Sequence, residues 1–215
     1  FVAHTDLSGN LYILASFRET ETLLFDLIDH PEEIERLAGQ ITRLWLRYYD
    51  ELDGIIRPAC RGTSCWTPLF STGKTYMLQC DFSYMISPAM FERFVMPDLI
   101  ACCEHLDHAF YHLDGKGEIP HLDLLLSIPC LCGIQWVPGD GQPPPEQWLP
   151  LLKRIRDGGK LCQVTVTPEG ALHIVRNLGG RGFMFWVQAA PEFQDPAQVQ
   201  AFLDTLTRED ATRNT

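Results

Sequence analysis

Apolar and polar positions follow two different periods along the chain. Six stretches carry nearly continuous apolar runs, which is typical of strands buried on both faces of a parallel sheet. Each is followed by a polar turn and then by a longer stretch of different pattern. The predicted strands are 1–7, 74–83, 108–115, 131–139, 160–168 and 181–191.

The stretches between these strands place apolar residues at steps of three and four, the period of a helix. In residues 30–52, Pro31 and two acids open the first turn. One apolar stripe follows, formed by Ile34, Leu37, Ile41, Leu44 and Tyr48. Residues 57–73 are rich in Pro, Gly, Ser and Thr, so we expect a loop there. The predicted helices are 11–29, 30–52, 87–107, 119–129, 143–159, 169–180 and 195–210.

Alternating helices and strands of this kind predict an α/β protein, either an open doubly wound sheet or part of a (β/α)8 TIM barrel. The last three strand-and-helix units are short, which favours the barrel. Six strands are two short of a closed barrel, so we expect an N-terminally incomplete barrel of about six β/α units. We treat residues 1–215 as a single domain, and the two exposed sheet edges predict association into a homo-oligomer.

The net charge and the cysteine content limit the classes of binding partner and the cellular compartment that we expect. The formal net charge is −11, which argues against a nucleic-acid partner because phosphate-binding surfaces need clustered Lys and Arg. The eight cysteines follow no disulfide-framework spacing and contain no CxxC pair, so we expect reduced thiols in the cytoplasm. There is no signal peptide and no apolar run of membrane-spanning length, so we expect no membrane contact. We expect the substrate to be a small molecule.

In both α/β folds the chemistry gathers at the carboxyl ends of the strands, which we call the mouth. Polar residues stand at every predicted strand end, and His121 begins a short helix near the same place. His112 and Asp114 are two residues apart on one strand, so they share one face. The strand-end set is His4, Asp6, Asp81, Ser83, His112, Asp114, Gln135, Thr165, Thr167 and Gln188.

His112 and Asp114 form a candidate metal site, because an imidazole and a carboxylate on one strand face suit zinc when further donors join them. Those donors could come from Cys80, Asp81, His4 or Gln188. Alternatively, Asp114 acts as a general acid or base with His112 as its partner, or the two merely share a hydrogen bond.

Asp6 and Asp81 add two carboxylates at strand ends. Buried carboxylates near one another raise one another's pKa, which suits proton transfer. The alternative for Asp6, which precedes Ser8 and Gly9, is simple turn formation.

The chain resembles the uroporphyrinogen decarboxylase superfamily, which also contains zinc-dependent methylcobalamin:coenzyme M methyltransferases and their corrinoid-linked relatives. The resemblance rests on the order and spacing of several stretches along nearly the whole chain. It implies a TIM barrel of which this chain is the C-terminal two-thirds. The stretches are "DLSGNLYILASFRETETLLFDLIDHPEEIERL", "LQCDFSYMISPAMFERFVMPDL", "FYHLDGKGEIPHLDLLL", "GIQWVPG" and "DPAQVQAFLDTL".

In the methyltransferase branch of that family, a strand ends in His-x-Cys-Gly, and its His and Cys bind zinc with a later Cys. Here the stretch is "HLDG", so His112 matches and Asp114 stands where Cys is expected. Gln188 lies near the position of the later Cys, or of the decarboxylases' His, so a thiolate-rich site is absent. Asp81 corresponds to a polar substrate-binding position of the decarboxylases.

The resemblance leaves three expectations for function. The first is a corrinoid-linked methyltransferase that uses Asp81, His112 and Asp114, with zinc on His112 and Asp114 and the corrinoid carried by a partner protein. The second is a decarboxylase of porphyrin metabolism, for which Arg57, Arg61 and Arg181 are the available cations. The third is a non-catalytic binding barrel. In each case we expect substrate binding by Asp6, Ser83, His121, Gln135 and Gln188.

Overall fold

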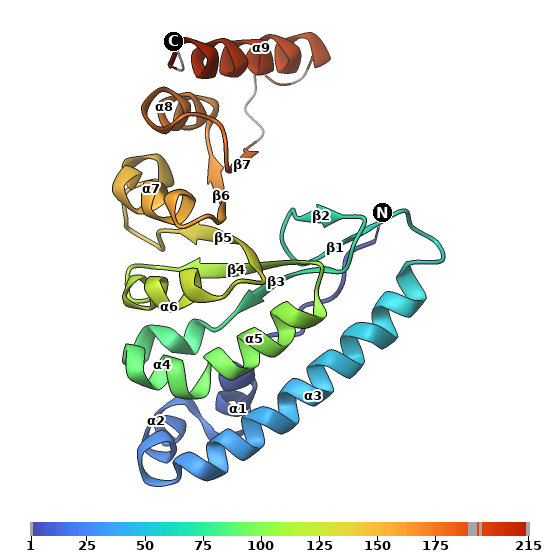
Figure 1. Ribbon diagram of the computed structural model, residues 1–215, viewed down its shortest axis with the longest axis vertical. Coiled ribbons are helices and arrows are strands. Elements are labelled where there is room, and N and C mark those ends of the chain that lie inside the picture. Colours follow the sequence, from blue (N-terminus) through green and yellow to red (C-terminus); the bar gives the residue numbers. More distant parts are fainter. Residues whose placement is uncertain (1, 189–192, 194, 214–215) are drawn as a thin grey trace. The chain divides into compact units, whose positions relative to one another are not determined.

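The computed structural model describes residues 2–188, 193 and 195–213 (Figure 1). The chain divides into two compact units, Phe1–Cys132 and Gly133–Thr215, which are described one at a time. Whether the two belong to a single barrel domain stays a prediction.

The first unit opens with two helices, α1 (Asn10–Arg18) and α2 (Thr20–Asp29), where the pattern predicts one continuous helix over 11–29. The prediction of continuity is wrong at Glu19, whose φ of 63° lies in the left-handed region and ends the helix. Arg18 then pairs with Asp26 across the break at 2.8 Å, which ties the two short helices together.

Helix α3 (Pro31–Ile56) contains the helix predicted over 30–52 and extends it by one turn. The predicted stripe is wrong in part: Ile34 is buried, but Leu44 and Tyr48 are 47% and 48% exposed. The buried face runs one position further along, through Trp45 and Tyr49. Residues 57–73 do form a connection, but it includes two short antiparallel strands, β1 (Thr63–Ser64) and β2 (Phe70–Ser71).

The strand predicted for residues 1–7 is wrong over its described part. Residues 2–7 form one isolated parallel bridge, Ala3 to Ser64, supported by the His4 N–H donating to the Ser64 carbonyl at 2.9 Å. Leu7 N–H turns instead to the Tyr76 hydroxyl at 2.6 Å, so the segment bends away before a ladder can form.

Two parallel strands form the sheet of this unit: β3 (Thr75–Gln79) and β4 (His108–Asp114), in the register Gln79 opposite His112. The strand predicted over 74–83 ends early, because residues from Asp81 onward wind into a short 3-10 helix, η1 (Asp81–Met85). The sequence prediction for β4 is confirmed.

The helix predicted over 87–107 is two helices, α4 (Pro88–Phe94) and α5 (Met96–His105). Pro97 explains the break, since it lacks an N–H and its ring clashes with the carbonyl four residues earlier. Ser87 caps α4 by accepting the Met90 N–H at 3.3 Å. Helix α5 packs on β4, and the long α3 runs beside α5 (Figure 1).

After β4 the chain forms a 3-10 turn, η2 (Ile119–His121), and the short helix α6 (Leu122–Ser127). Strand β5 (Leu131–Val137) begins in the last residues of the first unit and continues in the second.

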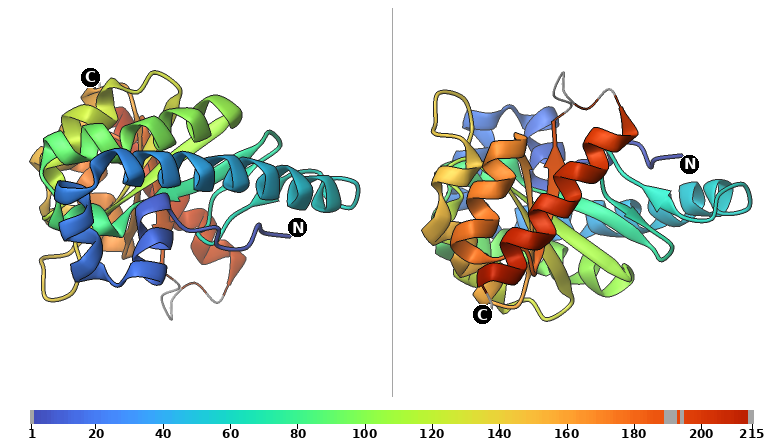
Figure 2. Two further views of the ribbon diagram at one scale, coloured as in Figure 1. Left: turned by 90° about the horizontal axis from the view of Figure 1, so that it is seen from below. Right: turned by 90° about the horizontal axis from the view of Figure 1, so that it is seen from above.

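In the second unit β5 pairs in parallel with β6 (Leu161–Val166), and β6 pairs in parallel with β7 (Phe183–Val187). The connections are η3 (Pro145–Gln147) with α7 (Leu149–Asp157), then α8 (Pro168–Leu178). Helix α9 (Pro196–Arg213) packs on α8 (Figure 2, right). The core residues Ile155 and Ile174 are fully buried on α7 and α8.

Parallel strands joined by helices in both units confirm the α/β class. Closure into a TIM barrel of about six β/α units is not settled by these strands and stays a proposal. Among the described residues, no helix combines the length and the apolar character needed to cross a bilayer.

Candidate functional site

As predicted, His112 lies beside other polar residues at the carboxyl ends of two adjacent strands, β3 and β4. Because Gln79 lies opposite His112 in the parallel register, both strands end at the same edge. Asp81 opens η1 immediately after β3, while His112 and Asp114 occupy the last positions of β4. Side chains alternate along a strand, so the latter two point to one face.

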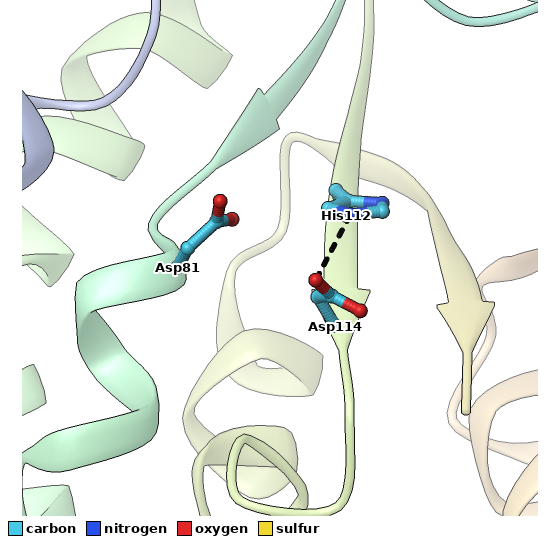
Figure 3. A group of neighbouring side chains, drawn as sticks. All are labelled: Asp81, His112 and Asp114. Atoms are coloured by element: carbon cyan, nitrogen blue, oxygen red, sulfur yellow. Dashed lines mark ion pairs between the residues drawn. The ribbon is translucent and has the colours of Figure 1, made fainter. Parts of the chain in front are cut away.

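These three side chains form one group, which we call the Asp-His-Asp group (Figure 3). One ligand atom from each lies within 4.8 Å of the others, and His112 Nε2 is 3.9 Å from Asp114 Oδ2. In Figure 3 the Asp81 carboxylate reaches from η1 toward the strand that carries the other two. Asp81 is exposed and the other two are half-buried, so the group is open to a ligand from solvent.

One wall of the group is aromatic. The Trp66 ring meets the His112 ring edge-on, with centroids 5.1 Å apart and an interplanar angle of 84°. Trp66 is itself fixed by its Nε1–H, which donates to the Met77 carbonyl at 3.0 Å. A ring held in this way restricts the rotation of the imidazole, which favours a preorganised ligand position.

Asp6 is held by turn-type contacts, as the alternative reading of this residue predicts. Its Oδ1 accepts the Ser8 N–H at 2.8 Å and the Gln79 amide at 3.1 Å, with the Tyr76 hydroxyl at 3.4 Å. The carboxylate is nevertheless close enough to Asp81 to act on its charge. Asp6 therefore contributes negative potential at this edge of the sheet.

Although part of the Asp81 residue is exposed, desolvation of its carboxyl group by the neighbouring protein raises its pKa; His112 opposes the shift, and the negative charges of Asp114 and Asp6 add to it. Nearby carboxylates favour the protonated form in one another. A cation placed among them would reverse this effect and hold all of them ionised.

A fourth carboxyl group lies behind the others. Glu118 is fully buried, and its Oε2 accepts the Asp114 N–H at 3.2 Å and the Tyr111 hydroxyl at 3.5 Å. Within the described residues its Oε1 has no hydrogen-bond partner. Burial raises the pKa of Glu118 to about 8, although the hydrogen bond from the Asp114 N–H lowers it.

Sequence reasoning missed Glu118, although a signal was present. It follows the glycines of the "DGKGE" turn that leaves β4, and the turn folds it back under the strand end. Its contact with the Asp114 backbone fixes the end of the strand, so this glutamate helps to position the carboxylate of the Asp-His-Asp group.

Ser83 and His121 lie together, but beneath the surface. His121 Nε2 contacts the Ser83 carbonyl oxygen at 2.9 Å, and its ring stacks on Phe91 with centroids 4.4 Å apart. Both residues are almost completely buried, and burial lowers the pKa of His121. They support η1, on which Asp81 sits, so direct substrate binding by either residue stays a prediction.

Two of the further zinc donors considered from sequence are buried and are not members of the Asp-His-Asp group. His4 is buried, stacks on Tyr49 with centroids 4.4 Å apart, and has Nε2 3.5 Å from Asp53. Cys80 is buried as well, and burial raises the pKa of its thiol well above the ordinary value, which disfavours the thiolate that binds metals. Asp81 joins His112 and Asp114 within the first unit, while Gln188 lies in the second unit and its role as a donor stays a prediction.

The remaining predicted residues lie in the second unit. Gln135 is a buried residue of β5 opposite Gln163, and Gln188 follows β7 with its N–H donating to the Val166 carbonyl at 3.0 Å. Thr167 caps α8 by accepting the Gly170 N–H at 3.1 Å. A role for Gln135 or Gln188 in substrate binding stays a prediction.

The Asp-His-Asp group offers two oxygen donors and one nitrogen donor. Such a set suits zinc and harder divalent ions, and it leaves coordination positions for water or substrate. Without a metal, the same atoms could act as a general acid and base. Family models that were compared with the chain gave no match, and neither did a search of curated proteins.

Proposed function

We propose that the chain is a metal-dependent enzyme of the α/β class whose Asp-His-Asp group holds one divalent cation, with zinc as the favoured ion. The observation that carries the proposal is the convergence of three ligand atoms within 4.8 Å at the ends of two adjacent parallel strands. The fit between these residues and zinc rests on their donor types, because imidazole nitrogen and carboxylate oxygen are both ordinary zinc ligands.

The bound ion would act as a Lewis acid toward a small substrate at its open positions. His112 would hold it through one ring nitrogen, with the Trp66 contact fixing the ring. Asp81 and Asp114 would supply its charge balance. Glu118, behind the group, keeps the end of β4 in place through the Asp114 N–H.

Methyl transfer is the reaction we favour, because the resemblance drawn from the strand-end stretches includes zinc-dependent methyltransferases. In this proposal the corrinoid is carried by a partner protein. Replacement of the family's cysteine by Asp114 gives an oxygen-rich site, so activation of an oxygen- or nitrogen-bound methyl group suits it better than activation of a thiol.

Decarboxylation of a tetrapyrrole has less support. Such a substrate carries many carboxylates and needs cations around it. Here the strand ends present Asp6, Asp81 and Asp114, whereas Arg57 is committed to Asp53 in a partly buried ion pair. The local charge would repel this substrate.

Zinc titration by isothermal calorimetry, followed by elemental analysis of the dialysed protein, tests the proposal. We expect one ion per chain, with affinity lowered at least about tenfold in His112→Ala and in Asp81→Asn. His108→Ala is the matched control, since this histidine lies at the other end of the same strand, against Ser71. Equal affinity in all four proteins would contradict the proposed site.

Turnover is tested separately, by following the formation of methylcobalamin from cob(I)alamin with a panel of small O-methyl and N-methyl donors. Metal-dependent turnover that His112→Ala abolishes supports methyl transfer. Release of carbon dioxide from a porphyrinogen by the metal-free protein would instead favour the decarboxylase.

A further inference from the structure

An exposed aromatic side chain, Tyr84, lies on the same short helix as Asp81. Helix η1 begins at Asp81, and residues three apart in a 3-10 helix eclipse one another along its axis. Asp81 and Tyr84 therefore share one face, about 6 Å apart along the axis at about 2 Å per residue. The burial pattern agrees, because both are exposed, whereas Phe82 and Ser83 between them are buried.

A glycine fixes the position of this ring. A Cβ added to Gly117 would lie 2.5 Å from two carbon atoms of the Tyr84 ring, Cδ2 and Cε2, so the ring packs directly against the glycine. Gly117 stands three residues after Asp114, in the turn that leaves β4. The ring thus extends from the helix that begins with Asp81 to the turn that follows Asp114.

The Tyr84 ring offers apolar surface to a ligand. Tyr84 is 50% exposed although Gly117 covers part of its ring, and the next residue, Met85, is also exposed. Trp66 differs, because its ring is already engaged by His112. Small-molecule sites combine a few polar groups with apolar and aromatic surface of this kind. A ligand held by the Asp-His-Asp group would therefore have an aromatic surface one turn of η1 away.

We propose that Tyr84 is a specificity-determining residue of the Asp-His-Asp group, and that the substrate joins an oxygen or nitrogen head group to a planar apolar body. This inference rests on the proposed function, because the head group meets the cation that the three ligands hold. The planar body stacks on the exposed part of the Tyr84 ring. An aliphatic compound with the same head group lacks this contact and binds more weakly.

Two hydroxamates that differ only in this body test the proposal. Acetohydroxamate and benzohydroxamate carry the same chelating head group, and the second has a phenyl ring in place of a methyl group. Each is titrated by isothermal calorimetry into the zinc-loaded protein. We expect benzohydroxamate to bind at least about tenfold more tightly, because only its ring reaches Tyr84.

Variants at position 84 assign this preference to the ring. Tyr84→Ala should reduce the preference to less than about threefold, while the affinities for zinc and for acetohydroxamate stay within about twofold of the parent. Tyr84→Phe keeps the ring and should keep the preference. Tyr12→Ala is the matched control, because this tyrosine is 52% exposed on α1, outside the group, and its loss should change neither affinity.

Gly117→Ala is a second test, because it displaces the ring without removing it. The φ of Gly117 lies outside the left-handed region, so alanine suits the backbone, but the new Cβ would meet the Tyr84 ring at 2.5 Å. We expect the preference for benzohydroxamate to fall at least about threefold with zinc affinity unchanged. Thermal unfolding of each variant checks the fold, and Gly117→Ala allows a test even where Tyr84→Ala does not fold.

The possible failures are distinguishable. Zinc binding by the parent protein with equal affinity for the two hydroxamates would overturn this inference and leave the proposed function standing. So would a preference for benzohydroxamate that Tyr84→Ala retains in full. Absence of zinc binding to the parent protein would overturn the proposed function, and this inference with it.

Discussion

Replacing Glu118 by glutamine should stabilise the protein at neutral pH, because it exchanges a fully buried carboxyl group for a neutral amide of similar size. The native carboxyl group has a pKa raised by burial from 4.5 to about 8, so the folded state holds a proton that the unfolded chain has lost. Glutamine has nearly the same shape, can accept the Asp114 N–H through its amide oxygen, and carries no ionisable group.

The magnitude follows from proton linkage. Between the two pKa values the folded state binds more protons than the unfolded state, so the native stability falls as pH rises from 4.5 towards 8. Each unit of this interval lowers the free energy of unfolding by about 1.4 kcal/mol. From pH 5 to pH 7, the native protein should therefore lose about 2 to 3 kcal/mol relative to Glu118→Gln.

The assay is urea unfolding of both proteins at several pH values between 4.5 and 8, with the difference in unfolding free energy plotted against pH. Glu92→Gln is the control, because this glutamate is exposed on α4 and its variant should parallel the native protein. A flat difference for Glu118→Gln across the range, or a rise of native stability relative to the variant, would refute the reasoning.

Three further predictions concern other parts of the molecule. Asp53→Ala should lower the free energy of unfolding by about 2 kcal/mol in urea titrations, because it leaves Arg57 and His4 without their carboxylate partner. Glu51→Ala removes only an exposed pair with Arg47, so it should change the free energy of unfolding by less than about 1 kcal/mol. Ile155→Ala should cost about 3 kcal/mol in the same assay through the cavity left in the second unit, and a cost under about 1 kcal/mol would contradict its full burial. A thiol reagent should label three of the eight cysteines quickly in the native protein and the five buried ones only after unfolding, and rapid labelling of all eight would contradict the fold. The three half-buried cysteines are Cys60, Cys130 and Cys132.

Periodicity predicted the elements well where one pattern ran without interruption. Helix α3 and the apolar run of β4 were both found where expected. The face of α3 that is buried was not, since Trp45 and Tyr49 are buried in place of Leu44 and Tyr48. Periodicity failed where a single backbone angle or a proline decided where a helix ends. The apolar spacing continues through Glu19 and Val95 without a break. The positive φ of Glu19 nevertheless divides one predicted helix, and Pro97 divides the other.

The site was predictable in part for a similar reason. The two-residue period of a strand places His112 and Asp114 on one face from sequence alone. That Asp81 is the third member depends on the parallel register of β3 and β4 and on the 3-10 turn after β3, which are long-range features. The glycine turn after β4 and the acid that ends it can be seen in the sequence, but the burial of Glu118 depends on how that turn folds back, which local patterns do not encode.

The most direct test of the metal site is a crystal grown with zinc and measured at the zinc absorption edge. We expect one anomalous peak at the ends of β3 and β4, about 2.0–2.2 Å from an oxygen of Asp81, a ring nitrogen of His112 and an oxygen of Asp114. A fully occupied peak on other residues, or none at this group, would contradict the account.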